Sequence, residues 1–291
     1  MAVEGLQIDY TKNQFIQQSY IHYMKLNAKD KELINAYKAE MDASDWADKP
    51  LDITYTVINW ILYRLRSTPM RNMPNLLTDR ALTKEQFVNQ IIHAKRLVDI
   101  LSTFPKITEG VNNIGIPNHI TVFRGETAKL GKFIKRQNKE TSIYSFLSTT
   151  MNLEVAAAFN KGILLVIHIP ANKPLPFISD HLSLNYRKGT SSSESEVLLP
   201  PGSTFQINGY VDNATVFGKN CDVIYLTLIQ FGPDDSMWKN LNKNANALYN
   251  TLYSEKMNID DQPQNSSQPK KRRTSHGRSH KKQNKSRKNK I

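Results

Sequence analysis

The hydrophobic pattern changes its period near Pro117, and no other feature of the sequence limits the fold as strongly. Before Pro117, apolar residues recur at the spacing of a helix face: Phe87, Ile91, Ala94, Val98 and Leu101. After Pro117, short runs typical of β-strands alternate with loops. Helices that come first and strands that come later indicate an α+β fold, because an alternating α/β fold would place helices between the strands.

The helical part is expected to cover about residues 1–112, with one helix at about 51–66. A further helix should begin at Thr83, since Gln86 three residues later completes a capping box. Pro105 should end this helix, because the residue before a proline avoids the α region.

The β part is expected to cover about residues 118–232. The runs that predict strands are 119–123, 145–150, 163–169, 196–199, 204–210 and 223–230. An alanine-rich stretch at about 153–160 predicts a short helix among them, and a last helix at about 236–256 should close the domain. The folded domain would then span residues 1–258.

Residues 259–291 contain no aromatic residue, leucine or valine. Such a segment cannot bury enough apolar surface to offset the entropy of ordering, so we expect a disordered tail. The formal net charge of the chain is +13, and residues 262–291 hold eleven Lys or Arg and no acid. Residues 1–261 keep 28 of the 39 basic residues and all 26 acidic ones. A basic surface spread over the whole fold, as in many nucleic-acid-binding domains, is therefore not expected.

The basic tail allows several partners. Residues 270–273, Lys-Lys-Arg-Arg, resemble a nuclear-import signal. The tail could instead bind nucleic acid or an acidic membrane by counterion release, or act only as a solvated segment. The chain starts without a signal-peptide pattern, and its longest apolar run, 163–169, is too short for a membrane span. We therefore expect a soluble intracellular protein, nuclear if the import signal is used, and the sequence leaves non-classical secretion open.

Motifs for several common chemistries are missing. No G-x-G-x-x-G, P-loop, H-E-x-x-H or paired C-x-x-C occurs, so neither a Rossmann-type dinucleotide site nor a metal site is expected. His168 lies inside an apolar run, where a hydrogen-bonded structural histidine is the expected role. Cys221 is the single cysteine, and its place beside a strand that should be buried argues against a nucleophile.

Three short motifs occur in order, each at the edge of an expected strand: TVFRGE at 121–126, SFLSTT at 145–150 and SESEVLLPPG at 193–202. Each alone has an ordinary explanation. An arginine at a strand end pairs with a surface carboxylate, hydroxyls form cross-strand bonds, and two glutamates on an exposed loop are solvated. The three motifs together are more specific than any one of them.

Together the motifs resemble the arginine-specific ADP-ribosyltransferases, most closely the enzymatic components of binary actin-modifying bacterial toxins. That family carries an Arg, a Ser-Thr-Ser and a Glu-x-Glu on three strands. The matching residues are Arg124, Ser148-Thr149-Thr150 and Glu194-Ser195-Glu196, with Thr150 in place of the last serine. Residues 55–59 also resemble a helix that borders the NAD pocket in the toxins, so the resemblance spans about residues 50–230.

The resemblance implies the ADP-ribosyltransferase fold, with a helical N-terminal part and a two-sheet, mostly antiparallel β core. It also implies four catalytic residues. Glu196 would stabilise the positive charge that develops on the ribose of NAD, and Ser148 would hold Glu196 in place. Arg124 would bind the pyrophosphate. Glu194 would orient the guanidinium of an acceptor arginine and take its proton.

Tyr55, Asn59, Gly125 and Phe159 would join Arg124 in binding NAD. The backbone at Gly125 could approach the nicotinamide amide because no side chain intervenes. Phe159 has two possible roles, either stacking on NAD or packing in the core against Ala156–Ala158. Residues 186–193, rich in serine, would contact the target protein.

The implied function is transfer of ADP-ribose from NAD to an arginine of a target protein, without a metal. Two alternatives stay open: an NAD glycohydrolase or nucleic-acid ADP-ribosyltransferase that uses the same pocket, and an inactive binding module. Glu194 argues against the first and the complete Arg, Ser and Glu set against the second. The implied partners are a protein with an accessible arginine and, through the tail, a nucleic acid or an import receptor.

Overall fold

The computed structural model describes part of the chain, namely residues 13–38, 58–59, 61–62, 83–111, 118–179, 195–233, 237–241, 243, 245–247 and 249–250. Most of the helix expected at 51–66 lies outside these residues, although 58–59 and 61–62 are helical. The closing helix expected at 236–256 is helical wherever it is described. The tail at 259–291 lies outside the described residues.

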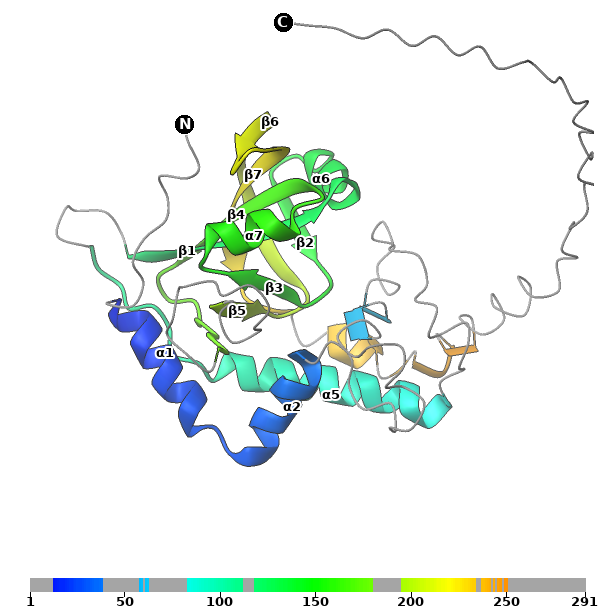
Figure 1. Ribbon diagram of the computed structural model, residues 1–291. Helices are drawn as coiled ribbons and strands as arrows, with labels where there is room; N and C mark the ends of the chain where they lie inside the picture. Colours follow the sequence, from blue (N-terminus) through cyan, green and yellow to red (C-terminus); the bar gives the residue numbers. More distant parts are fainter. Residues whose placement is uncertain are drawn as a thin grey trace, which may run out of the picture.

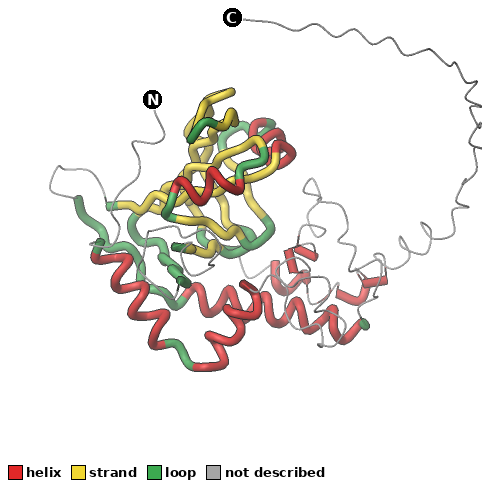
Figure 2. Tube along the Cα trace, viewed as in Figure 1, coloured by secondary structure: helices red, strands yellow, loops and turns green. Residues whose placement is uncertain are grey.

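Three helices of the N-terminal part lie on one side of the strands (Figures 1 and 2): α1 (Gln14–Lys25), α2 (Ala28–Lys38) and α5 (Lys84–Ser102). The side chain of Asn13 caps α1 by accepting from the N–H groups of Phe15 and Ile16 at 2.9 and 3.4 Å. The capping box predicted for α5 is present, with Thr83 and Gln86 each bonded to the other's backbone N–H.

One hydrophobic cluster joins these helices to the sheet. The apolar series that predicted α5 is buried in it, together with Ile34 of α2 and Trp238 near the end of the domain. Phe146 and Leu198 enter the same cluster from the strand side. The helices therefore pack directly against the strands that carry two of the three motifs.

In the part of the chain that the structure describes, seven strands form one sheet in the order β2-β6-β7-β4-β1-β3-β5. Their bounds are β1 His119–Thr127, β2 Glu140–Ile143, β3 Leu147–Thr150, β4 Gly162–Pro170, β5 Glu196–Leu199, β6 Ser203–Val216 and β7 Lys219–Gln230. The expectation of two sheets is wrong. β7 pairs in parallel with β4 and antiparallel with β6, so the strands join into a single mixed sheet. All other pairings are antiparallel, as expected.

Two short helices lie between the strands. α7 (Leu153–Phe159) matches the helix expected there, and Asn152 caps it by accepting from Glu154 N–H at 2.9 Å. α6 (Ala128–Lys135) and β2 were not expected from the sequence. No helix in the described part of the chain combines the length and hydropathy that a bilayer crossing needs.

Candidate active site

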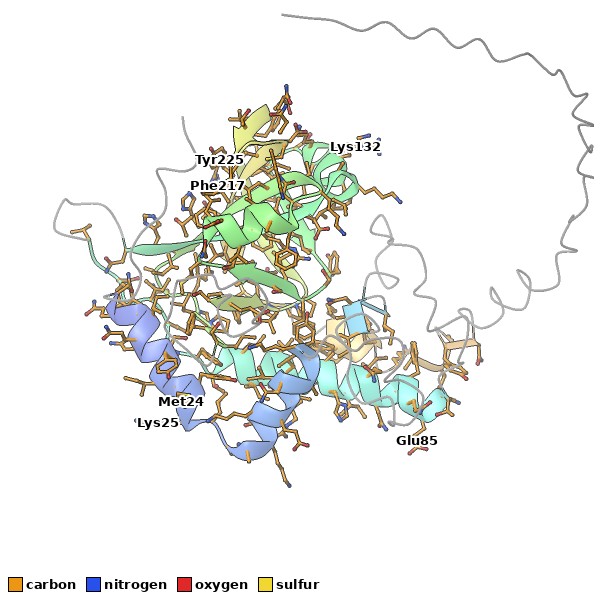
Figure 3. The ribbon with its side chains drawn as sticks, in the orientation of Figure 1. Met24, Lys25, Glu85, Lys132, Phe217 and Tyr225 are labelled. Carbon is orange, nitrogen blue, oxygen red and sulfur yellow. The ribbon has the colours of Figure 1, made fainter. Side chains whose placement is uncertain are left out.

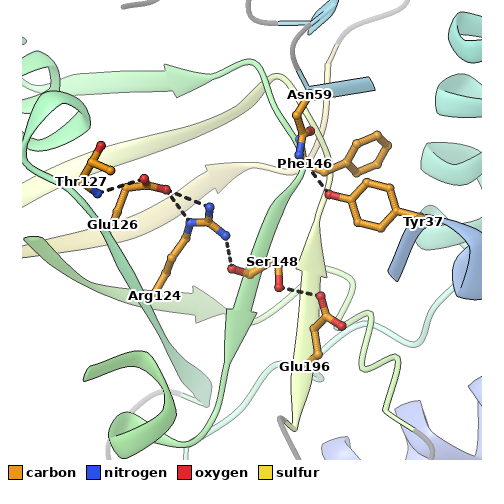
Figure 4. A network of polar contacts seen from close by, with 8 residues as sticks. All are labelled: Tyr37, Asn59, Arg124, Glu126, Thr127, Phe146, Ser148 and Glu196. Carbon is orange, nitrogen blue, oxygen red and sulfur yellow. Dashed lines mark hydrogen bonds and ion pairs between the residues drawn. The ribbon is translucent and has the colours of Figure 1, made fainter. Parts of the chain in front are cut away.

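The three motifs meet on neighbouring strands. Arg124 lies on β1, Ser148 on β3 and Glu196 at the start of β5, and these strands are adjacent in the sheet (Figure 4). The contact between β1 and β3 is narrow, since its register holds a single residue pair, Phe123 and Thr150. The side chain of Arg124 reaches the main chain of β3 at the carbonyl of Ser148.

Ser148 and Glu196 are joined directly. Ser148 Oγ donates to Glu196 Oε1 at 2.6 Å. In the register of β3 and β5, Ser148 faces Leu198 and Glu196 faces Thr150, so the bonded residues are diagonal neighbours on one face. That face also carries Leu198, which is buried against the helices. The carboxylate therefore lies between the sheet and the helical part.

The main chain of Glu196 is held from a second direction. Its N–H donates to Ser179 Oγ at 2.6 Å, and its carbonyl accepts from the N–H of Ile178 at 3.0 Å. Ile178 and Ser179 are both buried. Since Glu196 is itself only 6% exposed, its position is fixed by both side chain and backbone.

Arg124 has a partner that sequence analysis missed. Its Nε and Nη2 donate to Glu126 Oε2 at 3.0 and 2.8 Å, and its Nη1 donates to the carbonyl of Ser148 at 2.6 Å. The other carboxylate oxygen of Glu126 accepts from Thr127 N–H at 3.0 Å. Residues i and i+2 share a face of a strand, so the order Arg-x-Glu on β1 was the available signal. A surface carboxylate was the ordinary partner considered for this arginine, but the partner found, Glu126, is buried.

Lys38 also belongs to the site and was missed. Its Nζ lies 4.0 Å from Glu196 Oε2 and donates to the carbonyl of Ile178 at 3.1 Å. Lys38 is the last residue of α2, and its partners lie 140 or more residues away in sequence. No local pattern in the sequence marks such a contact.

Asn59, an expected NAD-binding residue, is bonded within the protein. Its Oδ1 accepts from the N–H of Phe146 at 2.8 Å, and its Nδ2 donates to Tyr37 Oη at 3.3 Å. The rings of Tyr37 and Phe146 also pack together, with centroids 5.0 Å apart. Asn59 thus ties the segment that leads into β3 to the end of α2 (Figure 4). Tyr55 lies outside the described residues.

Gly125 is required by packing. A Cβ atom on Gly125 would lie 2.2 Å from the carbonyl oxygen of Ala156 and 2.5 Å from Asn160 N, so β1 runs directly beside the end of α7. Phe159, the last residue of α7, is 55% exposed. Packing in the core, one of its two expected roles, is therefore wrong.

Glu194 and residues 186–193 lie outside the described residues. The next residue, Ser195, is fully buried and has φ 46°, in the left-handed region. Its carbonyl accepts from the N–H of Met151 at 3.2 Å. β5 begins directly after Ser195, at Glu196, so Ser195 does not share the extended conformation of the strand.

His168 and Cys221 lie within the sheet, on β4 and β7. His168 Nδ1 lies 3.0 Å from Thr121 Oγ1, so it is a hydrogen-bonded histidine as expected, and burial, followed by the nearby His119, lowers its pKa. Cys221 is buried in β7, and burial raises the pKa of its thiol. Such a thiol stays protonated and is a poor nucleophile. Among the described residues, no three His, Cys, Asp or Glu side chains gather as they would around a metal ion.

The chain matches one family model, described as ADP-ribosyltransferase exoenzyme, over residues 81–227. This range contains all three motifs and runs from the capping box of α5 into β7. No curated protein matches the chain in sequence.

Solved structures resemble the chain more distantly. Vis toxin from Vibrio splendidus is 16% identical with a TM-score of 0.45, over 79% of this chain and 87% of that one. C3larvin toxin from Paenibacillus larvae is 17% identical with a TM-score of 0.44, over 74% and 94%. C2-I of the C2-toxin from Clostridium botulinum is 18% identical with a TM-score of 0.46, over 76% and 48%.

Proposed function

The chain belongs to the ADP-ribosyltransferase exoenzyme family, whose members are transferases that use NAD as substrate, and we propose that it transfers ADP-ribose from NAD to an arginine of a target protein. The observation that carries the proposal is the hydrogen bond of 2.6 Å between Ser148 and Glu196. Arg124 donates to the main chain of the same serine. Residues of the three motifs thus form one connected group.

Glu196 has the properties that cleavage of a glycosidic bond needs. It is nearly buried, and its orientation is held through Oε1 by Ser148 and through its backbone by Ser179. A fixed carboxylate in a water-poor site stabilises positive charge on a sugar better than a solvated one, because it need not reorganise as the charge develops. Ser148 can donate this bond without transferring its proton, so the hydrogen bond itself does not neutralise the carboxylate.

Arg124 is suited to bind an anionic group. Its guanidinium is half-buried, and Glu126 and Ser148 O fix the plane of the fork. A planar fork with a fixed orientation suits the oxygens of a pyrophosphate. The exposed ring of Phe159, beside Gly125, is available to stack on a flat group of the same substrate.

The choice of arginine as acceptor rests on Glu194. A guanidinium stays protonated in proteins and is a poor nucleophile. A carboxylate two residues before Glu196 in sequence would orient one nitrogen of the acceptor and take its proton as the new bond forms. The proton then rests on Glu194, and nicotinamide leaves with the electron pair of the broken bond.

The test measures NAD hydrolysis and transfer of labelled ADP-ribose to agmatine, a small guanidine. We expect both activities in the wild type. Glu194→Gln should lose transfer and keep hydrolysis, whereas Glu196→Gln should lose both. Glu140→Gln, which changes an exposed carboxylate on β2, is the matched control and should behave as wild type. Hydrolysis without transfer in the wild type would contradict arginine transfer, and absence of both activities would contradict the proposed reaction.

A further inference from the structure

The carboxylate of Glu196 faces a cation supplied by α2. Lys38 Nζ lies 4.0 Å from Glu196 Oε2, and the two side chains are 17% and 8% exposed. Among the described residues, Lys38 is the one cation that forms an ion pair with Glu196. Taking a charge this far out of water is costly unless an opposite charge lies nearby.

We propose that Lys38 is a positioning residue for Glu196, which holds the charged carboxylate in the orientation needed for cleavage of NAD. The inference rests on the proposed function, because it assigns Lys38 a role only if Glu196 acts on the ribose. Lys38 acts through Glu196 and takes no part in bond making or breaking.

The two oxygens of Glu196 are held in different ways. Oε1 accepts a hydrogen bond of 2.6 Å from Ser148. Oε2 lies 4.0 Å from the ammonium, which is beyond hydrogen-bond distance. The field of Lys38 therefore stabilises the charge on Oε2 without using its lone pairs, and this oxygen keeps its capacity to accept from a hydroxyl of the substrate.

The ammonium is itself anchored. Lys38 Nζ donates to the carbonyl of Ile178 at 3.1 Å. Ile178 also donates its own backbone N–H to the carbonyl of Glu196. The next residue, Ser179, accepts from Glu196 N–H through its Oγ. One short segment thus fixes both the lysine and the glutamate, so the distance between their charges depends little on the flexible stem of the lysine.

The end of α2 is fixed as well. Tyr37, the residue before Lys38, packs against Phe146 and accepts from Asn59 Nδ2. Phe146 lies two residues before Ser148 on the segment that enters β3. Lys38 and Ser148, the two residues that hold the carboxylate of Glu196, are therefore linked through the packing of α2 on the sheet.

Three substitutions at Lys38 distinguish the effect of its charge from the effect of its hydrogen bond. Lys38→Met removes the charge and the hydrogen bond, Lys38→Gln removes the charge and keeps a donor, and Lys38→Arg keeps the charge. The matched control is Lys29→Met, an exposed position on the same helix. For each variant we would measure kcat and KM for NAD in hydrolysis and in transfer to agmatine, with the melting temperature as a check on folding.

We expect Lys38→Met and Lys38→Gln to lower kcat by about 10- to 100-fold, with KM for NAD within about twofold of wild type. Lys38→Arg should recover most of kcat, and Lys29→Met should behave as wild type. A merely structural lysine would instead lower the melting temperature without this split between kcat and KM. If Lys38→Met does not fold, Lys38→Gln and Lys38→Arg decide the matter.

An unchanged kcat in Lys38→Gln would overturn the proposal. An increased kcat would overturn it as well, because the lysine would then compete with the substrate. The same holds if Lys38→Arg is as impaired as Lys38→Gln. A wild type inactive in both assays would contradict the proposed function instead, so the two failures are distinguishable.

Discussion

Arg124 and Glu126 lie two residues apart on β1, and two nitrogens of the guanidinium, Nε and Nη2, donate to the single oxygen Oε2 of the carboxylate. The second oxygen, Oε1, accepts from the backbone N–H of Thr127. The arginine expected to bind the pyrophosphate is thus held by a buried carboxylate that also offsets part of its charge. Its orientation is set before any substrate arrives.

Glu126→Gln should weaken this arrangement although it preserves side-chain size. A glutamine has one acceptor oxygen, which cannot serve both Arg124 and Thr127 N–H, so its NH₂ group must face a donor. We expect the free energy of unfolding to fall by about 1–3 kcal/mol and KM for NAD to rise by about tenfold. Urea unfolding and steady-state hydrolysis measure the two effects. Glu140→Gln is the control, and equal stability and KM in both variants would contradict the role of Glu126.

Ser148→Ala should lower the rate of NAD hydrolysis. The variant removes the donor to Glu196 Oε1, a hydrogen bond to a charged group worth about 1.5–3 kcal/mol. If that energy serves the transition state, kcat for NAD hydrolysis should fall by about 10- to 100-fold. Ser142→Ala is a suitable control, because its hydroxyl lies 2.8 Å from Thr204 Oγ1 on strands outside the site. A Ser148→Ala enzyme with wild-type kcat would show that Glu196 needs no such donor.

Gly125→Ala should be among the more damaging small substitutions in the domain. The new Cβ would meet backbone atoms of Ala156 and Asn160, which can move only if α7 moves. We expect a loss of about 1–3 kcal/mol or more in the free energy of unfolding. Gly131→Ala provides the comparison, because its Cβ would meet the side chain of Ile163, which can change its rotamer. A smaller loss for Gly125→Ala than for Gly131→Ala would contradict this explanation.

Asp222→Asn should reduce the acid sensitivity of the fold. The hydrogen bond from Lys135 at 2.7 Å, followed by one from Asn213 N–H, lowers the pKa of Asp222 below its ordinary value, against the effect of burial. A carboxyl whose pKa is lowered in the folded state stabilises the protein above its unfolded pKa of about 3.9. This stabilisation is lost as pH falls below that value through the folded pKa.

The check is the urea midpoint of unfolding measured from pH 5 down to pH 3. The wild type should lose more of its midpoint over this range than Asp222→Asn does. Asp99→Asn is the control, since Asp99 is 62% exposed and pairs with Lys95 on the surface of α5. Identical pH profiles for the wild type and Asp222→Asn would contradict the assignment.

Much of the fold could be predicted from local patterns. The capping box of Thr83 and Gln86 and the apolar series after it predicted α5, and the alanine-rich stretch predicted α7. β2 was missed because three of its four residues are polar and because its strand depends on pairing with β6, more than 50 residues away in sequence. α6 was missed because it is short, contains a glycine and lacks a side-chain cap at Thr127.

Prediction of the site was limited by sequence distance. The motif residues Arg124, Ser148 and Glu196 could be chosen in advance, and the sheet places them on adjacent strands. Glu126 was within reach of the rule that alternate residues share a strand face. Lys38 was not, because its contacts with Ile178 and Glu196 exist only once α2 has docked on the sheet.

The position of β7 has a consequence for how the chain is made. β7 is the last strand of the described residues, yet it lies between β6 and β4 and joins β2-β6 to β4-β1-β3-β5. Until residues 219–230 have left the ribosome, a nascent chain contains two separate groups of strands, each with an unpaired edge. Unpaired strand edges tend to pair with other chains. Ribosome pausing or premature termination upstream of β7 would therefore yield an aggregation-prone product in which the strands of all three motifs have already been synthesised.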